Sequence, residues 1–142
     1  MLDSISITFI TCFIFLFVSF FTEISANARC TKVVGRVHCQ TDWDRHFNVN
    51  IWLMDRDPLP WETDDYMAQA TSDEDGNFKI EGCAEDLGSW NSPDPYLVIE
   101  HRCPEPGHTV SIPRRRKIVL LEPVYTPETI YIGSIRLDED DE

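Results

Sequence analysis

Hydrophobic and polar residues alternate along several short stretches of the chain. The clearest is residues 47–54, FNVNIWLM, in which Phe, Val, Ile and Leu occupy every second position. A period of two puts these side chains on one face of a β-strand, so a half-buried strand is predicted there. Related patterns predict six further strands, at residues 32–39, 65–71, 78–82, 96–103, 116–122 and 129–137.

Turn-forming residues separate these stretches. Asp75-Gly76 lies between the strand at 65–71 and the strand that begins at Phe78, which predicts a β-hairpin with an Asp-Gly turn. Prolines and polar residues predict a loop at 56–64 and a connection at 83–94. Seven short strands with little helix predict an all-β fold, an antiparallel β-sandwich of about seven strands with Greek-key connections. A small closed barrel is the structural alternative.

The first residues have the pattern of a secretory signal peptide. An apolar run from Ile5 to Phe21 precedes Ala26-Asn27-Ala28, a small-x-small cleavage sequence, which predicts a signal peptide over 1–28. A retained membrane anchor is the alternative, because Asp3 makes the start of the run atypical. Cleavage leaves 29–142, the size of one domain, with an acidic tail at 138–142 that is predicted to be disordered. We therefore expect a secreted, extracellular protein.

Acidic residues dominate the composition. Asp and Glu number 25 against 12 Lys and Arg, giving a net charge of −13 at pH 7. Loss of Asp3 and Glu23 with the signal peptide leaves −11. This balance argues against nucleic acid as a partner.

One cluster of positive charge stands out in this acidic chain, Arg114, Arg115, Arg116 and Lys117. One interpretation is that these residues protect an edge strand from pairing with other chains. Another is that they bind an anionic surface, such as phosphatidylserine or a sulfated glycan, with peripheral contact to a membrane. Cleavage by a proprotein convertase is a third interpretation, which we discount because it would sever a core strand.

Several chemical motifs are incomplete. Asp73-x-Asp75-Gly76 matches the middle of an EF-hand loop, but Gly82 stands where a bidentate carboxylate is required, so a plain turn is favoured over a calcium site. His38-Cys39 and His101-x-Cys103 offer zinc ligands, yet cysteines of a secreted protein are normally oxidised to disulfides. The chain has no phosphate-binding glycine loop and no visible nucleophile motif. We predict no metal, no cofactor and no catalytic residue.

Two tryptophans, Trp61 and Trp90, lie in predicted loops. The favoured interpretation is that each ring covers one end of the core. The alternative is that the rings contact a ligand or a protein partner.

Four sequences in one order resemble the transthyretin-like family of secreted nematode proteins. They are VVGRVHC at 33–39, TSDEDGNFKIEGC at 71–83, PYLVIEHRC at 95–103 and IYIGSIRL at 130–137. The resemblance covers essentially all of 29–142 and implies a transthyretin-type sandwich. One departure is Glu122, which stands where the family usually has Ile before a proline and so bears on the burial of that strand end.

The resemblance also implies candidate functions. Most members have no assigned biochemical activity, and one branch is described as bridging phosphatidylserine on dying cells to a phagocyte receptor. A hydrolase among the structural relatives of transthyretin acts on 5-hydroxyisourate and ends in Tyr-Arg-Gly-Ser. Here Tyr131-Ile132-Gly133-Ser134 replaces the arginine with an apolar residue, which removes the charge that an anionic intermediate needs.

We therefore expect a non-catalytic extracellular adaptor or signalling protein, whose partner is a protein receptor or an anionic cell-surface ligand. A carrier of a small apolar ligand is the alternative, and the hydrolase is less favoured. A monomer is expected. Cys12 leaves with the signal peptide, and four cysteines allow three pairings, of which we choose Cys39 with Cys103 and Cys30 with Cys83.

Overall fold

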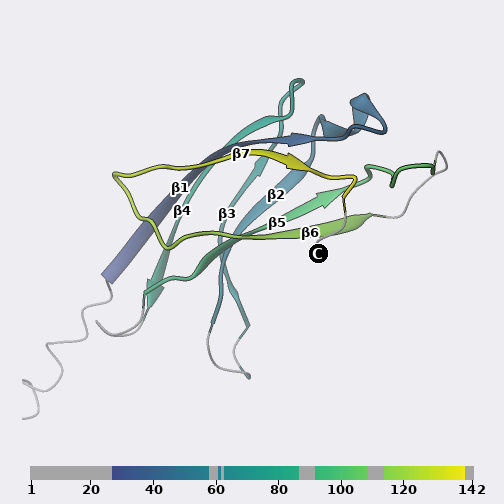
Figure 1. Cartoon of the computed structure of the whole chain (residues 1–142). Helices are drawn as coiled ribbons and strands as arrows, with labels where there is room; N and C mark the ends of the chain where they lie inside the picture. Colours follow the sequence, from purple (N-terminus) through teal and green to yellow (C-terminus); the bar gives the residue numbers. More distant parts are fainter. Residues whose placement is uncertain (1–26, 58–60, 62, 87–91, 109–113, 140–142) are drawn as a thin grey trace, which may run out of the picture.

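The computed structural model describes residues 27–57, 61, 63–86, 92–108 and 114–139 (Figure 1). Seven β-strands and one 3-10 helix, η1 (Trp43–His46), make up the described part. The strands are β1 (Asn27–His38), β2 (Asn50–Asp55), β3 (Asp65–Thr71), β4 (Asn77–Asp86), β5 (Pro95–His101), β6 (Arg115–Leu120) and β7 (Ile130–Arg136). The predicted all-β class is confirmed.

The strands form two sheets that pack as a sandwich. One has the order β4-β1-β7 and the other the order β3-β2-β5-β6 (Figure 1). All pairs are antiparallel except β1 with β7, which is parallel and sets Val33 opposite Ile130. The parallel pair departs from the antiparallel prediction. Its two strands are far apart in the sequence, so no tight turn joins them. Neighbouring residues therefore do not determine whether the two strands run parallel or antiparallel.

The predicted hairpin is wrong, although the predicted turn forms. The Asp73 carboxylate accepts hydrogen bonds from the amides of Asp75 (3.0 Å) and Asn77 (2.7 Å), and Gly76 has a φ of +82°. The strands on either side of this turn, β3 and β4, nevertheless lie in different sheets. The turn therefore carries the chain from one layer to the other, and β4 pairs with β1 instead of β3.

Strand β4 is longer than predicted and takes in the first part of the predicted connection at 83–94. It continues to Asp86 because β1 begins as early as Asn27 and offers a partner along this whole length. The predicted signal peptide lies mostly outside the described residues, and β1 includes its last two positions. None of the helices in the described ranges has the length and apolarity needed to span a bilayer.

The core lies between the two sheets. In β2 the burial alternates as the sequence predicts, with Ile51 and Leu53 fully buried. Residues of the other strands, and of the segments directly next to strands, complete the core: Val33, Val37, Cys39, Val49, Phe78, Ile80, Leu97, Ile99, Cys103, Ile135 and Leu137.

Two disulfides cross-link the strands in the pairing expected from the sequence. Cys39–Cys103 is fully buried and links the end of β1 in one sheet to the segment after β5 in the other. Cys30–Cys83 joins directly opposed residues of β1 and β4 within one sheet.

The first two residues of the predicted acidic tail, Asp138 and Glu139, make contacts with the domain. Asp138 is buried and forms an ion pair with Arg136 (3.3 Å), and the Glu139 carboxylate also pairs with Arg136 (2.5 Å). The carbonyl oxygen of Glu139 accepts a hydrogen bond from Nζ of Lys117 (2.9 Å). These contacts order 138–139, whereas 140–142 lie outside the described residues.

Candidate functional site

The outer face of the four-stranded sheet ends in an open cleft. Its volume is about 280 Å³. The walls come from η1 and the residues after it, the start of β2, the end of β5 and the residue before β6. We call it the arginine cleft, and it is lined by Asp44, Arg45, Phe47, Asn48, Val49, Asn50, Glu100, His101, Arg102 and Arg114.

Three arginines and two carboxylates, Asp44 and Glu100, line the cleft. Arg114 forms an ion pair with Glu100 (3.2 Å) from the neighbouring strand, and Arg45 pairs with Asp42 (2.9 Å). Arg102 has no ion-pair partner among the described residues and is exposed. Because a guanidinium presents several N–H donors in a fixed fork, an exposed arginine of this kind suits a carboxylate, phosphate or sulfate group.

Hydrogen bonds to the turn after β3 fix the position of η1. The buried His46 donates from Nε2 to the carbonyl oxygen of Glu74 (3.0 Å). The Ser72 hydroxyl donates to the carbonyl oxygen of His46 (2.6 Å) and accepts from the amide of Val49 (2.9 Å). Phe47 follows directly and remains 55% exposed at the rim of the cleft. The rim is thus held by contacts that lie 23 to 28 residues apart in the chain.

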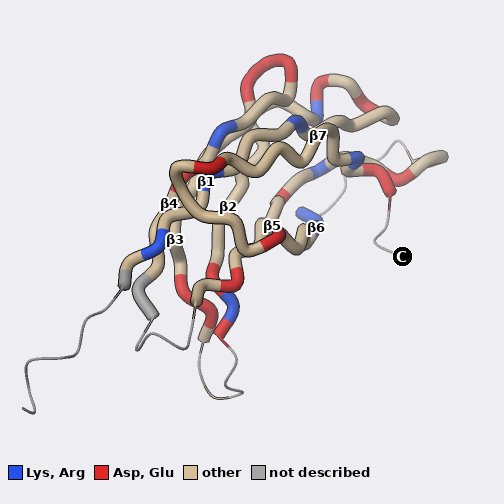
Figure 2. Tube along the Cα trace, turned by 60° about the vertical axis from the view of Figure 1, so that its left-hand side comes forward, with Lys and Arg blue, Asp and Glu red and all other residues tan. Residues whose placement is uncertain are grey.

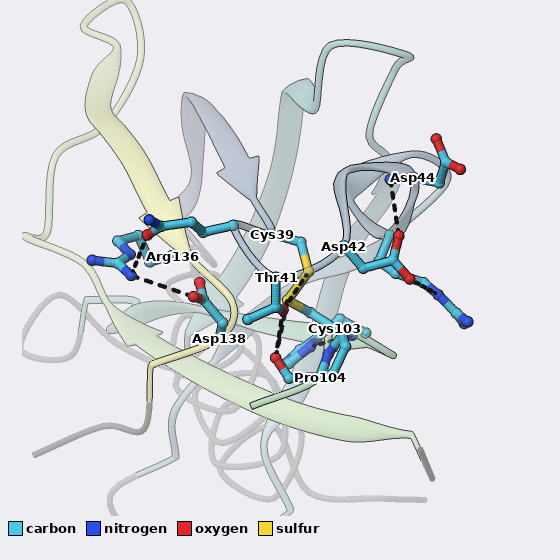
Figure 3. The surroundings of a disulfide bond; sticks show 11 residues. Cys39, Thr41, Asp42, Asp44, Cys103, Pro104, Arg136 and Asp138 are labelled. Carbon is cyan, nitrogen blue, oxygen red and sulfur yellow. Dashed lines mark hydrogen bonds and ion pairs between the residues drawn. A yellow bond between two sulfur atoms is a disulfide. The ribbon is translucent and has the colours of Figure 1, made fainter. Parts of the chain in front are cut away.

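The buried disulfide holds the two sides of the cleft together. Figure 3 shows Cys39 and Cys103 joined beside Thr41, whose hydroxyl donates to the carbonyl oxygen of Pro104 (2.7 Å). Asp42, at the N-terminal end of η1, accepts a hydrogen bond from the amide of Asp44 (3.3 Å). The loop before η1 and the segment after β5 are therefore covalently connected just behind the arginines.

Strand geometry divides the predicted basic patch between two faces. Arg114 and Arg116 point outward, with 62% and 72% of their side chains exposed, and both pair with Glu100. Arg115 lies on the other face and pairs with Glu105 (3.2 Å), while Lys117 reaches Glu139. Successive side chains of a strand point to opposite faces, so four adjacent cations cannot form one patch. Three of the four belong to β6, which is the edge strand of its sheet, and Figure 2 shows basic residues in blue at this strand.

Of the two tryptophans predicted to lie in loops, the structure describes only Trp61. Trp61 is 78% exposed, which does not fit a role in covering the core. Trp90 lies outside the described residues. Within the described ranges, no group of three or more His, Cys, Asp or Glu side chains is arranged to hold a metal ion.

Sequence reasoning missed Arg102, Arg45 and the two asparagines of the cleft. A signal for Arg102 was available, because it stands between the core-facing His101 and Cys103 and must therefore point outward. No sequence pattern indicated that η1 would form part of the cleft, because its position depends on contacts with the turn after β3.

Comparison with protein families matches residues 34–120, more than half of the chain, to the transthyretin-like family (TTR-52). The chain belongs to the transthyretin-like family. This confirms the resemblance that the four sequence motifs indicated. The family match spans β2 to β6, the end of β1 and every residue that lines the arginine cleft of this transthyretin-like protein.

Other comparisons add little to this assignment. A search of curated proteins gave no match. Among solved structures, the chain is similar to a 9R-lipoxygenase from Cyanothece PCC8801, with 16% identity and a TM-score of 0.43. That similarity covers 78% of this chain but only 17% of the lipoxygenase, and at this score it carries no information on function.

Proposed function

We propose that this transthyretin-like protein is a secreted, non-catalytic binding protein whose arginine cleft takes an anionic group of an extracellular partner. The observation that supports the proposal is Arg102, an exposed guanidinium without an ion-pair partner among the described residues, in a cleft that also holds Arg45 and Arg114. The overall charge of the sequence is strongly negative, so a local cationic site is the place where an anion can approach.

The chemistry of the cleft favours a small anionic group over an apolar ligand. Asn48 and Asn50 add amide groups beside the arginines, and Phe47 offers an aromatic face at the rim. A phosphate or carboxylate of a lipid head group and a sulfate of a glycan share the required geometry. A carrier of apolar molecules would need a mostly apolar cavity, which this cleft does not provide.

A binding comparison tests the proposal. The probes are phosphatidylserine vesicles, phosphatidylcholine vesicles, soluble phosphoserine and heparin, each titrated with the mature protein. Arg102→Ser is expected to lower affinity for the anionic probes roughly 10-fold, because a charge-assisted hydrogen bond is lost.

Lys79→Ser is the matched control, since it removes one exposed positive charge from the other sheet. Binding to the vesicles alone would identify a lipid surface as the source of the anion, and binding to heparin alone a glycan. The proposal fails if wild type and Arg102→Ser bind every probe equally, or if neither binds any of them.

A further inference from the structure

A second cleft lies at the opposite end of the four-stranded sheet from the arginine cleft. Its volume is about 240 Å³. The walls come from the residue after β2, the start of β5 with the residue before it, and the end of β6 with the residue after it. We call it the small cleft, and it is lined by Arg56, Asp94, Pro95, Tyr96, Leu120 and Leu121. Clefts for drug-sized ligands measure about 300–1,000 Å³, so this one suits a smaller molecule.

Hydrogen bonds of the backbone hold the walls of the small cleft to one another. The amide of Arg56 donates to the carbonyl oxygen of Asp94 (3.1 Å), which extends the pairing of β2 with β5 beyond the strand ends. The amide of Asp94 donates to the carboxylate of the buried Asp55 (2.6 Å). On the other side, the amide of Leu121 donates to the carbonyl oxygen of Pro95 (3.3 Å). The lining residues therefore have fixed backbone positions.

One cation and one anion share the small cleft without pairing. The Arg56 side chain lies over the ring of Tyr96, with Cζ 5.6 Å from the ring centroid. Asp94 is the residue directly across from Arg56, yet no ion pair joins them, and neither has an ion-pair partner anywhere in the described part of the chain. Both side chains are exposed. The N–H groups of Arg56 and the carboxylate of Asp94 are thus both accessible to a ligand.

Apolar side chains form the rest of the small cleft. Leu120 is 66% exposed at the end of β6, and Leu121 beside it is half-buried. Pro95 adds a buried apolar ring on the side of β5. An apolar group placed against Leu120 would remove apolar surface of both molecules from water, which is favourable. The small cleft therefore offers three kinds of contact, with a cation, with an anion and with an apolar wall.

We propose that the small cleft binds a free α-amino acid with an apolar side chain. Arg56 suits the carboxylate, because a guanidinium can donate two parallel hydrogen bonds to the two oxygens. Asp94 suits the ammonium group, and Leu120 suits the side chain. Within a peptide the α-amino and carboxyl groups are uncharged amides, so a residue inside a chain cannot make the same two contacts. This site is separate from the arginine cleft, so it goes beyond the proposed function and does not rest on it.

The same charges disfavour simpler ligands. A carboxylate that lacks an ammonium group would gain the contact with Arg56 but would face the negative charge of Asp94. An amine that lacks a carboxylate would face the positive charge of Arg56. Unfavourable contacts of this kind contribute to specificity together with the favourable ones. Both charges of the ligand are therefore expected to be necessary.

A titration of the isotope-labelled mature protein, followed by NMR chemical shifts, tests the proposal. The ligands are leucine, leucinamide, which lacks the carboxylate, and isocaproate, which is leucine without its ammonium group. Leucine is expected to shift the amides of Arg56 and Leu121 with a Kd on the order of 1 mM, typical of a small ligand in an open cleft. Leucinamide and isocaproate are each expected to bind roughly 10-fold more weakly, because each lacks one charge-assisted contact.

Substitutions assign the two charges. Arg56→Gln and Asp94→Asn are each expected to weaken leucine binding roughly 10-fold, and both side chains are exposed, so folding should be retained. Asp94→Asn should also bind isocaproate more tightly than wild type does, since the repelling charge is gone. A general loss of structure would not produce that gain. Arg102→Ser is the control, because it removes an exposed arginine from the arginine cleft and should bind leucine like wild type.

Three results would overturn the proposal. One is the absence of shifts with leucine up to roughly 20 mM, well above the expected Kd. Another is equal binding of leucine and isocaproate, which would make the small cleft a site for simple carboxylates. The third is unchanged leucine binding in Arg56→Gln or in Asp94→Asn, which would place the ligand elsewhere on the protein.

Discussion

The amide of Val37 donates a hydrogen bond to the carbonyl oxygen of Gly76 (2.9 Å), which ties β1 to the turn between the two sheets. The contact leaves no room for a side chain, since a Cβ at Gly76 would collide with the carbonyl oxygen of Val37. Gly76→Ala is therefore expected to lower the free energy of unfolding by roughly 3 kcal/mol or more, measured by urea denaturation. About 1–2 kcal/mol of that comes from the positive φ alone.

Gly107→Ala separates the two causes of the expected loss at Gly76, which are the positive φ and the collision with Val37. Gly107 has a φ of +87°, close to that of Gly76, but a Cβ added there would have no neighbouring atom within 4 Å. This variant should lose only the conformational part, about 1–2 kcal/mol. Equal losses at the two glycines would show that the contact with Val37 is unimportant.

The turn should also give a measurable dependence on pH. Burial opposes ionisation of Asp73, but hydrogen bonds from Asn77 and Asp75 outweigh it and hold the pKa of Asp73 below its ordinary value of 3.8. A depressed pKa contributes stability that is present above pH 3.8 and is lost as pH falls through the lowered value. Asp73→Asn keeps an acceptor for the turn but cannot titrate.

The stability difference between wild type and Asp73→Asn, followed by thermal unfolding, should therefore shrink on acidification. Asp73→Ala should be less stable than either protein at neutral pH. A difference that stays constant from neutral to acidic pH would contradict the role assigned to this carboxylate.

Tyr96 should ionise only at a pH well above the ordinary tyrosine value of 10. Burial and a short hydrogen bond from its hydroxyl to the Asp64 carboxylate raise the pKa of Tyr96 to about 12. The raised pKa contributes stability that is present below pH 10 and is lost as pH rises toward 12. Titration by the ultraviolet absorbance of tyrosinate should show this late step in wild type, and Tyr96→Phe should remove it. If the late step persists in Tyr96→Phe, it belongs to another tyrosine.

The two disulfides should contribute unequally. They close loops with similar sequence separations, 64 and 53 residues, so loop closure stabilises each by a similar amount, on the order of 4 kcal/mol. Cys39 and Cys103 are fully buried, whereas Cys83 is exposed, so removal of the first bond also leaves unfilled space in the core. Cys39→Ala with Cys103→Ala is expected to unfold at lower urea than Cys30→Ala with Cys83→Ala. Equal midpoints would show that loop closure alone sets the contribution.

The structural features that were predicted correctly are those that depend on residues close together in the sequence. Alternation along β2 correctly placed Ile51 and Leu53 in the core, and the turn chemistry of Asp73 and Gly76 was also correct. The turn did not indicate whether β4 would pair with β3 or cross to the other sheet. That choice depends on β1, a strand far away in the sequence.

The candidate site was only partly predictable for the same reason. Arg114 was identified from its charge, and the alternation rule already separates it from Arg115 and Lys117. The arginine cleft forms only when η1 approaches the end of β5. The buried disulfide and the contacts of His46 hold these segments together, and neither the position of η1 nor those contacts leave a pattern in the sequence.

The parallel pairing of β1 with β7 has a consequence for the order of folding during synthesis. The first strand to emerge is the central strand of its sheet, and one of its two partners is the last strand of the chain. Until β7 has been made, β1 keeps one edge of unpaired amides and carbonyls, which attract other extended chains. Release of the carboxyl-terminal segment is thus the moment at which this sheet becomes complete, so the nascent domain needs protection from aggregation up to that point.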